Sequence, residues 1–130
     1  MQRKFRLTRS EDFKRVRRDG KSYAHPLVVL IVQKSDQPRV RVGVAAGKTV
    51  GTAVIRNRSK RLLREVMRTL IPNITLRHGE RQTNHPDDAS GLDLILVARP
   101  KLASATLEET RQAVQNLLHR AQIITPVDES

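Results

Sequence analysis

Six cationic side chains and only one acidic side chain lie between residues 56 and 68, in the stretch RNRSKRLLREVMR. Five of the six cations are arginines, whose planar guanidinium group can hold a phosphate through two parallel hydrogen bonds. A cationic helix face is most often simply solvated, but such faces usually carry acids four residues away from the bases. Because only Glu65 is available here, we interpret the stretch as a phosphate-binding element.

The periodicity of this stretch predicts an amphipathic helix that begins at Asn57 and ends before Pro72. The apolar stripe along one side consists of Leu62, Leu63, Val66, Met67 and Leu70. The opposite side carries Arg58, Arg61, Glu65 and Arg68, with Lys60 and Arg64 flanking it. Free backbone N–H groups at the predicted helix start, near Asn57, would add to phosphate binding.

Positive charge is concentrated in the first part of the chain. The net charge is +12, and residues 1–70 contain 19 Lys and Arg against 5 Asp and Glu, whereas residues 71–130 contain 6 against 8. A one-sided positive field attracts nucleic acid, an anionic membrane surface or an acidic protein. The longest apolar run, residues 27–32, is far shorter than the roughly 20 residues of a membrane-spanning helix. With no cysteine and no apolar segment after the N-terminal cations, we expect a cytoplasmic protein without a membrane partner.

Other chemistries fit the sequence less well. The glycine-rich stretch from Gly43 to Thr49 resembles a nucleotide-binding P-loop, but it has three residues between its glycines where the motif needs four. We interpret it as a turn that brings Lys48 toward the arginine helix. The side chains of His78, His85, Asp87 and Asp88 match no standard metal-ligand spacing. Since no nucleophile–base pair stands out either, we expect no catalytic residue, no protein-held metal and no small-molecule substrate.

The remaining elements predict one α+β domain over residues 1–130. Helices are expected at residues 10–18, with Thr8 and Glu11 at capping-box spacing, and at residues 106–123, with Thr106 and Glu109 at the same spacing. Strands are expected at residues 27–33 and 39–45, paired as a hairpin, at residues 92–98, and in a short form at residues 21–24. Residues 78–91 read as a polar loop and residues 125–130 as a loose tail.

This arrangement favours structured or single-stranded RNA as the partner. An RNA-recognition-motif domain needs aromatic side chains on its central strands, and the three aromatic residues here all precede residue 24. A helix-turn-helix protein needs two adjacent helices, whereas strands separate these. The expected architecture is therefore an RNA-binding domain of three helices and a mixed sheet of about four strands.

With these motifs in place, the chain resembles the protein subunit of bacterial ribonuclease P. The opening matches at Arg6-Leu7 and Glu11-Asp12-Phe13. The central signature matches at Val42-Gly43-Val44, at Lys48 and Gly51, and over residues 53–65 around Arg56-Asn57-Arg58. The last strand matches from Asp93 to Arg99-Pro100, and the final helix matches at residues 107–110. The resemblance spans roughly residues 5–121. It implies a two-layer α/β sandwich with a left-handed β-α-β crossover, a hand that general statistics disfavour.

The resemblance also implies a function. The protein would be the accessory subunit of an endoribonuclease whose catalyst is an RNA, which removes the 5′ leader of precursor tRNA with Mg²⁺ held mainly by the RNA. It would bind both the catalytic RNA and the leader, the latter in a cleft between the sheet and the first helix. The positions that match the RNA-facing signature, with their basic neighbours, are Lys48, Arg56, Asn57, Arg58, Lys60, Arg61, Arg64 and Arg68.

Leader binding is expected at Phe13, Arg17, Arg9 and Arg41. The resemblance implies an aromatic residue at Phe13 and a second one a helical turn later, where this chain has Arg17. We hypothesise that Arg17 replaces the missing ring by guanidinium stacking and phosphate contact. The alternative function is that of a ribosome-associated or assembly protein which binds structured RNA without catalysis, because the same basic helix would serve it.

Overall fold

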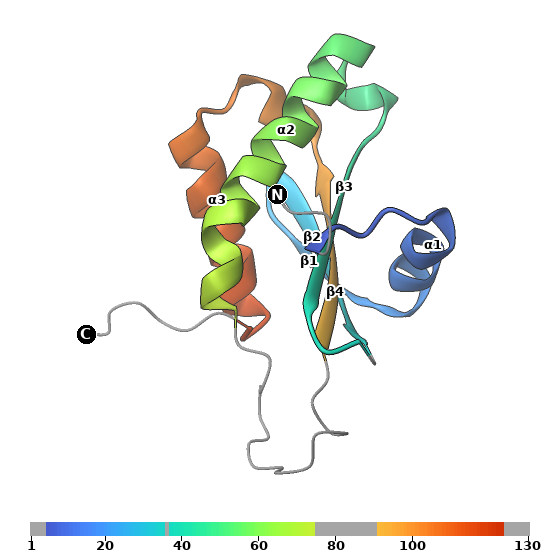
Figure 1. Ribbon diagram of the computed structural model, residues 1–130. Coiled ribbons are helices and arrows are strands. Elements are labelled where there is room, and N and C mark those ends of the chain that lie inside the picture. Colours follow the sequence, from blue (N-terminus) through green and yellow to red (C-terminus); the bar gives the residue numbers. More distant parts are fainter. Residues whose placement is uncertain (1–4, 36, 75–90, 124–130) are drawn as a thin grey trace, which may run out of the picture.

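Four strands form one mixed sheet, and helices lie against both of its faces (Figure 1). The computed structural model describes residues 5–35, 37–74 and 91–123. In chain order, the helices and strands are α1 (Ser10–Asp19), β1 (Lys21–Ala24), β2 (Val28–Ser35), β3 (Val40–Ala46), α2 (Ala53–Leu70), β4 (Gly91–Ala98) and α3 (Leu107–Arg120). Short 3₁₀ helices lie at η2 (Lys48–Val50), η3 (Ile71–Asn73) and η5 (Pro100–Ser104). The predicted α+β class, the four strands and the three α-helices are confirmed.

The strand order is β1-β2-β4-β3, so the last strand of the chain lies inside the sheet. β4 pairs antiparallel with β2 and parallel with β3. The predicted hairpin between residues 27–33 and 39–45 is therefore wrong, because β4 separates these two strands. The reason is that β4 is buried along almost its whole length, and such a strand needs hydrogen-bonding neighbours on both edges and cover on both faces. The hand of the crossover from β3 through α2 to β4 stays a prediction.

The main core lies between the sheet and the layer formed by α2 and α3. Alternate residues of β2, β3 and β4 point into it, since side chains alternate between the two faces of a strand. Leu30, Val42 and Leu94 are buried there against Leu63 and Met67 of α2 and against Val114, Leu117 and Leu118 of α3. This burial follows the predicted apolar stripes and fixes α2 with its cationic side away from the sheet.

A second, smaller core lies on the other face of the sheet, beneath α1. It consists of Leu7, Val16, Ile31 and Ile95, with Phe13, Val29 and Val97 partly buried beside it. The backbone N–H of Leu7 donates to the carbonyl of Val42 at 2.8 Å, which ties the chain before α1 to β3. The short helix α1 is thereby held against the central strands.

Two helix starts differ from the sequence prediction. α2 begins at Ala53, a full turn before Asn57, because the Thr52 hydroxyl caps it by accepting from the N–H of Ile55 at 3.3 Å. Gly51 precedes this cap with a φ of 149°, a value that glycine adopts most readily. α1 has Arg9 as its N-cap and no side-chain cap, so the predicted capping box of Thr8 and Glu11 is wrong.

Three other helix ends agree with the sequence. Gly20 ends α1, and Pro72 lies in the 3₁₀ turn that follows α2. At α3 the capping box of Thr106 and Glu109 is present in both directions, at 2.9 and 3.0 Å. α3 itself runs from Leu107 to Arg120, which is shorter than the predicted 106–123.

Several predictions fall outside the described residues. One is the polar loop predicted at 78–91, of which the structure describes only Gly91; the histidines and aspartates of this loop lie outside the described residues. Another is the tail predicted at 125–130. Within the described ranges, no helix combines the length and the apolar character needed to cross a bilayer.

Candidate nucleic-acid interface

The side of α2 turned away from the sheet carries Arg58, Arg61 and Arg68, all exposed. We call these three residues the cation face of α2. Arg68 is paired with Glu65, to which it donates two hydrogen bonds of 3.2 and 2.6 Å. Within residues 5–35, 37–74 and 91–123, neither Arg58 nor Arg61 has a carboxylate at ion-pair distance. These two guanidinium groups are thus presented to solvent with their charges uncompensated.

Less exposed cations flank this face. Arg56, Lys60 and Arg64 are each half-buried, and Asn57 is exposed. Burial lowers the pKa of the Arg64 guanidinium, and the positive charge of Arg6 lowers it further. Both causes make the cation less favourable in the free protein, so a nearby anion would stabilise it. Arg56 donates to the carbonyl of Gly51 at 3.4 Å and thereby lies close to the start of α2.

Lys48 lies on the 3₁₀ turn that joins β3 to α2, and its side chain is exposed. This agrees with the prediction that the glycine-rich turn brings Lys48 toward the arginine helix. The predicted helix start near Asn57 is wrong, however, so its free backbone N–H groups are not at that residue. Since the first turn of α2 is at residues 53–56, the free N–H groups lie nearer Lys48 than predicted.

The second candidate surface is on the opposite face of the sheet, next to α1 (Figure 1). The ring of Phe13 lies directly over Gly43 of β3, where an added Cβ would be only 2.4 Å from Cζ of the ring. A residue without a side chain is therefore needed at 43 for the ring to take this position. Arg17 is exposed one helical turn further along α1.

Beside α1, three neighbouring strands leave an apolar strip partly uncovered. Val29 of β2 is in register with Val97 of β4, and Val97 is in register with Ala45 of β3. All three residues are half-buried, whereas Ile31 and Ile95, in the next row under α1, are buried. We call Val29, Val97 and Ala45 the apolar strip. Together with Phe13, it could contact the apolar face of a base or a sugar.

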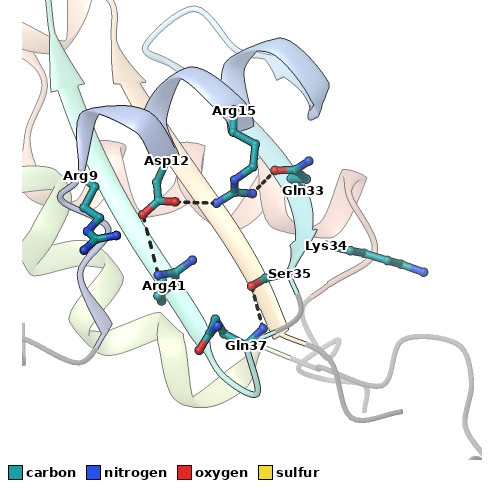
Figure 2. A pocket seen from close by; sticks show the side chains of 8 residues that line it. All are labelled: Arg9, Asp12, Arg15, Gln33, Lys34, Ser35, Gln37 and Arg41. Atoms are coloured by element: carbon teal, nitrogen blue, oxygen red, sulfur yellow. Dashed lines mark hydrogen bonds and ion pairs between the residues drawn. The ribbon is translucent and has the colours of Figure 1, made fainter. Parts of the chain in front are cut away.

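A buried carboxylate anchors α1 to the sheet. Asp93 of β4 is fully buried and accepts hydrogen bonds from Arg41 at 3.0 and 2.9 Å and from Arg15 at 2.7 Å. Figure 2 shows Arg15 reaching from α1 to Gln33 and Asp12, while Asp12 also lies 3.9 Å from Arg41. The hydrogen bond to Asp93 is the main cause that raises the pKa of Arg15. This cluster ties α1 to β2, β3 and β4.

A pocket of about 490 Å³ opens beside this cluster, with Arg9 and Lys34 at opposite sides of the view in Figure 2. Both of these side chains are exposed. Arg41, predicted as a leader-binding residue, is in contrast engaged with Asp93 and Asp12. Sequence reasoning gave no role to Arg15 and did not identify the buried pair. The signal in the sequence is Asp93, which lies within a run of apolar residues. A carboxylate buried in such a strand needs a cationic partner.

The predicted site residues therefore form two groups. The RNA-binding group lies on α2 and the turn before it, and the leader-binding group lies on α1, its N-cap and β3. Figure 1 places α2 and α1 on opposite sides of the sheet. Neither group resembles a metal site: in the described ranges, no three His, Cys, Asp or Glu residues are grouped so that they could hold a metal ion.

Comparison with known proteins identifies the family. A family model described as ribonuclease P matches residues 1–122. The ribonuclease P protein component of Herpetosiphon aurantiacus is 39% identical over 123 residues, covering 95% of this chain and 89% of the relative. That of Exiguobacterium sp. is 33% identical over 123 residues, with 95% of each chain covered.

Solved structures agree in fold. The RNase P protein from Thermotoga maritima superposes with a TM-score of 0.70 at 26% identity, covering 88% of this chain and 96% of that one. The Staphylococcus aureus protein gives a TM-score of 0.71 at 22% identity, covering 93% and 98%, and supports the fold.

The fold and the family match together define a protein of a tRNA-processing ribonucleoprotein. The chain belongs to the ribonuclease P family, as the protein subunit of that endoribonuclease. The family match decides against the alternative of a ribosome-associated or assembly protein.

The buried cluster predicts a large effect of one substitution. Asp93→Ala leaves Arg15 and Arg41 without their shared anion, and removing one partner of a buried pair costs several kcal/mol. Because both arginines keep some access to water, we expect a loss of roughly 2–4 kcal/mol in the free energy of unfolding, measured by urea denaturation. Asp19→Ala, which breaks an exposed pair with Arg18, is the control and should leave the free energy of unfolding nearly unchanged. Equal losses in the two variants would contradict this assignment.

Proposed function

We propose that the cation face of α2 binds the RNA subunit of ribonuclease P. Lys48 and the flanking residues Arg56, Asn57, Lys60 and Arg64 take part in the same contact. The surface of α1 and the apolar strip bind the 5′ leader of precursor tRNA. The RNA performs the cleavage with Mg²⁺, and this chain contributes no catalytic residue. The protein works in the cytoplasm, where both RNAs are present.

One observation carries this proposal: Arg58 and Arg61 are exposed without carboxylate partners in the described part of the chain. Like charges at helical spacing destabilise a helix slightly, and a bound phosphate removes that cost. The cations around α2 do not ligate Mg²⁺, which prefers oxygen atoms. We therefore assign the metal to the RNA and a charge-neutralising role to α2.

The assignment of the leader rests on the other face of the sheet. The single ring of Phe13 and the apolar strip give a base an apolar surface, and exposed Arg9 and Arg17 supply cations for the phosphates. Arg41 contributes differently from Arg9 and Arg17. Its guanidinium is bound to Asp93 through two hydrogen bonds, so it holds α1 in place and has few donors left for RNA.

The direct test is reconstitution. The purified protein is added to a bacterial ribonuclease P RNA at low Mg²⁺ concentration, and 5′-leader cleavage of a precursor tRNA is followed by gel electrophoresis. We expect the protein to restore cleavage that the RNA alone does not perform under these conditions. The absence of any stimulation, with a homologous ribonuclease P protein active in parallel, would refute the proposed function.

Leader recognition gives a second prediction. Stacking of a base on an aromatic ring is worth about 1–3 kcal/mol, so Phe13→Ala should weaken the affinity of the reconstituted enzyme for precursor tRNA by roughly fivefold or more. Arg17→Ala should weaken it as well, if the guanidinium replaces the second ring. Mature tRNA, which lacks the leader, is the matched control and should bind both variants like the wild type. Unchanged precursor affinity in Arg17→Ala, with a loss in Phe13→Ala, would show that Arg17 does not replace the ring.

A further inference from the structure

A hollow of about 390 Å³ lies between α2 and the segment that leads from β4 into α3. Its α2 side is formed by Arg58, Arg61 and Leu62, and its other side by Leu102, Ala105 and Leu107. Leu102 is buried at the base, while Leu107 stays 43% exposed. The hollow thus combines an apolar interior with two guanidinium groups from the cation face of α2.

The exposed leucine needs an explanation. Among the described residues, Val54 and Leu107 are the large apolar side chains that are exposed, to 76% and 43%. Leu107 lines the hollow together with Arg58 and Arg61, which have no carboxylate partner within residues 5–35, 37–74 and 91–123. A partner that is apolar in its middle and anionic at its edges would satisfy both groups at once.

The start of α3 does not offer a phosphate site at the mouth of this hollow. The Thr106 hydroxyl accepts the N–H of Glu109, and the Glu109 carboxylate accepts the N–H of Thr106. This reciprocal cap occupies the N–H of Glu109 and places a negative charge at the helix start. The anion must therefore be bound by the arginines, and the interior is left for an uncharged, planar or apolar group.

We propose that the hollow takes an unstacked nucleobase of the ribonuclease P RNA. Sequence-specific recognition of RNA uses bases that are splayed out of the helix and packed against side chains or guanidinium planes. The apolar side chains of Leu62, Ala105 and Leu107 contact the base, and Arg58 and Arg61 bind the adjoining phosphates. This inference rests on the proposed function, because it places the RNA subunit on α2.

The RNA subunit is the occupant for a reason of position. The leader surface, formed by α1 and the apolar strip, lies on the opposite face of the sheet from α2 (Figure 1). A single-stranded leader bound there is separated from the hollow by the sheet. The cation face of α2, by contrast, borders the hollow directly through Arg58 and Arg61.

The base contact can be located first by crosslinking. The chain has no cysteine, so Leu107→Cys creates a unique attachment point for a photoreactive label. We expect the labelled protein, bound to a bacterial ribonuclease P RNA together with precursor tRNA, to crosslink to one or two nucleotides in a non-helical segment of the ribonuclease P RNA. An Asn116→Cys protein, labelled at an exposed site further along α3, is the control for random contact.

Affinity then tests the contact itself. Leu107→Ser should weaken binding to the RNA by roughly fivefold, and by the same factor at every salt concentration, because the lost contact is uncharged. Val54→Ser, the same kind of change on α2 outside the hollow, should cost less than about twofold. Thermal denaturation checks that both variants remain folded. An abasic nucleotide at the crosslinked position should remove the difference between wild type and Leu107→Ser.

The outcomes separate this inference from the proposed function. If the wild-type protein neither binds nor activates the RNA, the proposed function fails. If the wild type is active and Leu107→Ser binds as tightly, the inference about the hollow is overturned and the proposed function stands. Equal losses in Leu107→Ser and Val54→Ser, or crosslinks confined to the precursor tRNA leader, also overturn it.

Discussion

The structure depends on β4, which is hydrogen-bonded on both edges and covered on both faces. Leu92, Leu94 and Leu96 point into the core with α2 and α3, and Ile95 points into the core with α1. Asp93, on the same face as Ile95, is the one charged residue that this strand buries. A buried carboxylate is tolerated only with close cationic partners, so Arg15 and Arg41 have to converge on it. The position of α1, and with it the surface around Phe13, follows from this constraint.

The same sheet separates the two proposed binding surfaces, which differ in character. On one side, α2 is anchored by its apolar stripe and presents Arg58 and Arg61, which have no carboxylate partner among the described residues. On the other side, the cations Arg15 and Arg41 are largely neutralised by Asp93 and Asp12, and the surface next to them is an aliphatic strip with one aromatic ring. The first surface suits the dense phosphates of a folded RNA, and the second suits a single strand held by its bases.

The sequence predicted the parts of this arrangement that depend on local pattern. The stripe of α2 and the cap of α3 have regular spacings, and both are present. The start of α2 was misplaced because Val54 and Ile55 are weak helix formers, and the signal lay in Gly51 and Thr52.

Strand pairs and ion pairs between residues far apart in the sequence could not be predicted from local pattern. The hairpin was predicted because neighbouring strands usually pair, whereas β4 comes from much later in the chain. The partners of Asp93 are 52 and 78 residues away from it, and no periodicity links them. The hollow beside Leu107 likewise arises only when the segment after β4 folds against α2.

The central claim is that phosphates neutralise the exposed arginines of α2, and the salt dependence of RNA binding measures this directly. If about six phosphates of single-stranded RNA are neutralised, the logarithm of the association constant should fall with the logarithm of salt concentration at a slope of about −4. Replacing Arg58 and Arg61 by alanine should flatten the slope by about one unit per arginine, while Arg18→Ala, whose side chain is paired with Asp19 on α1, should leave it unchanged. A wild-type slope near zero, or a slope that the double replacement does not alter, would contradict the account.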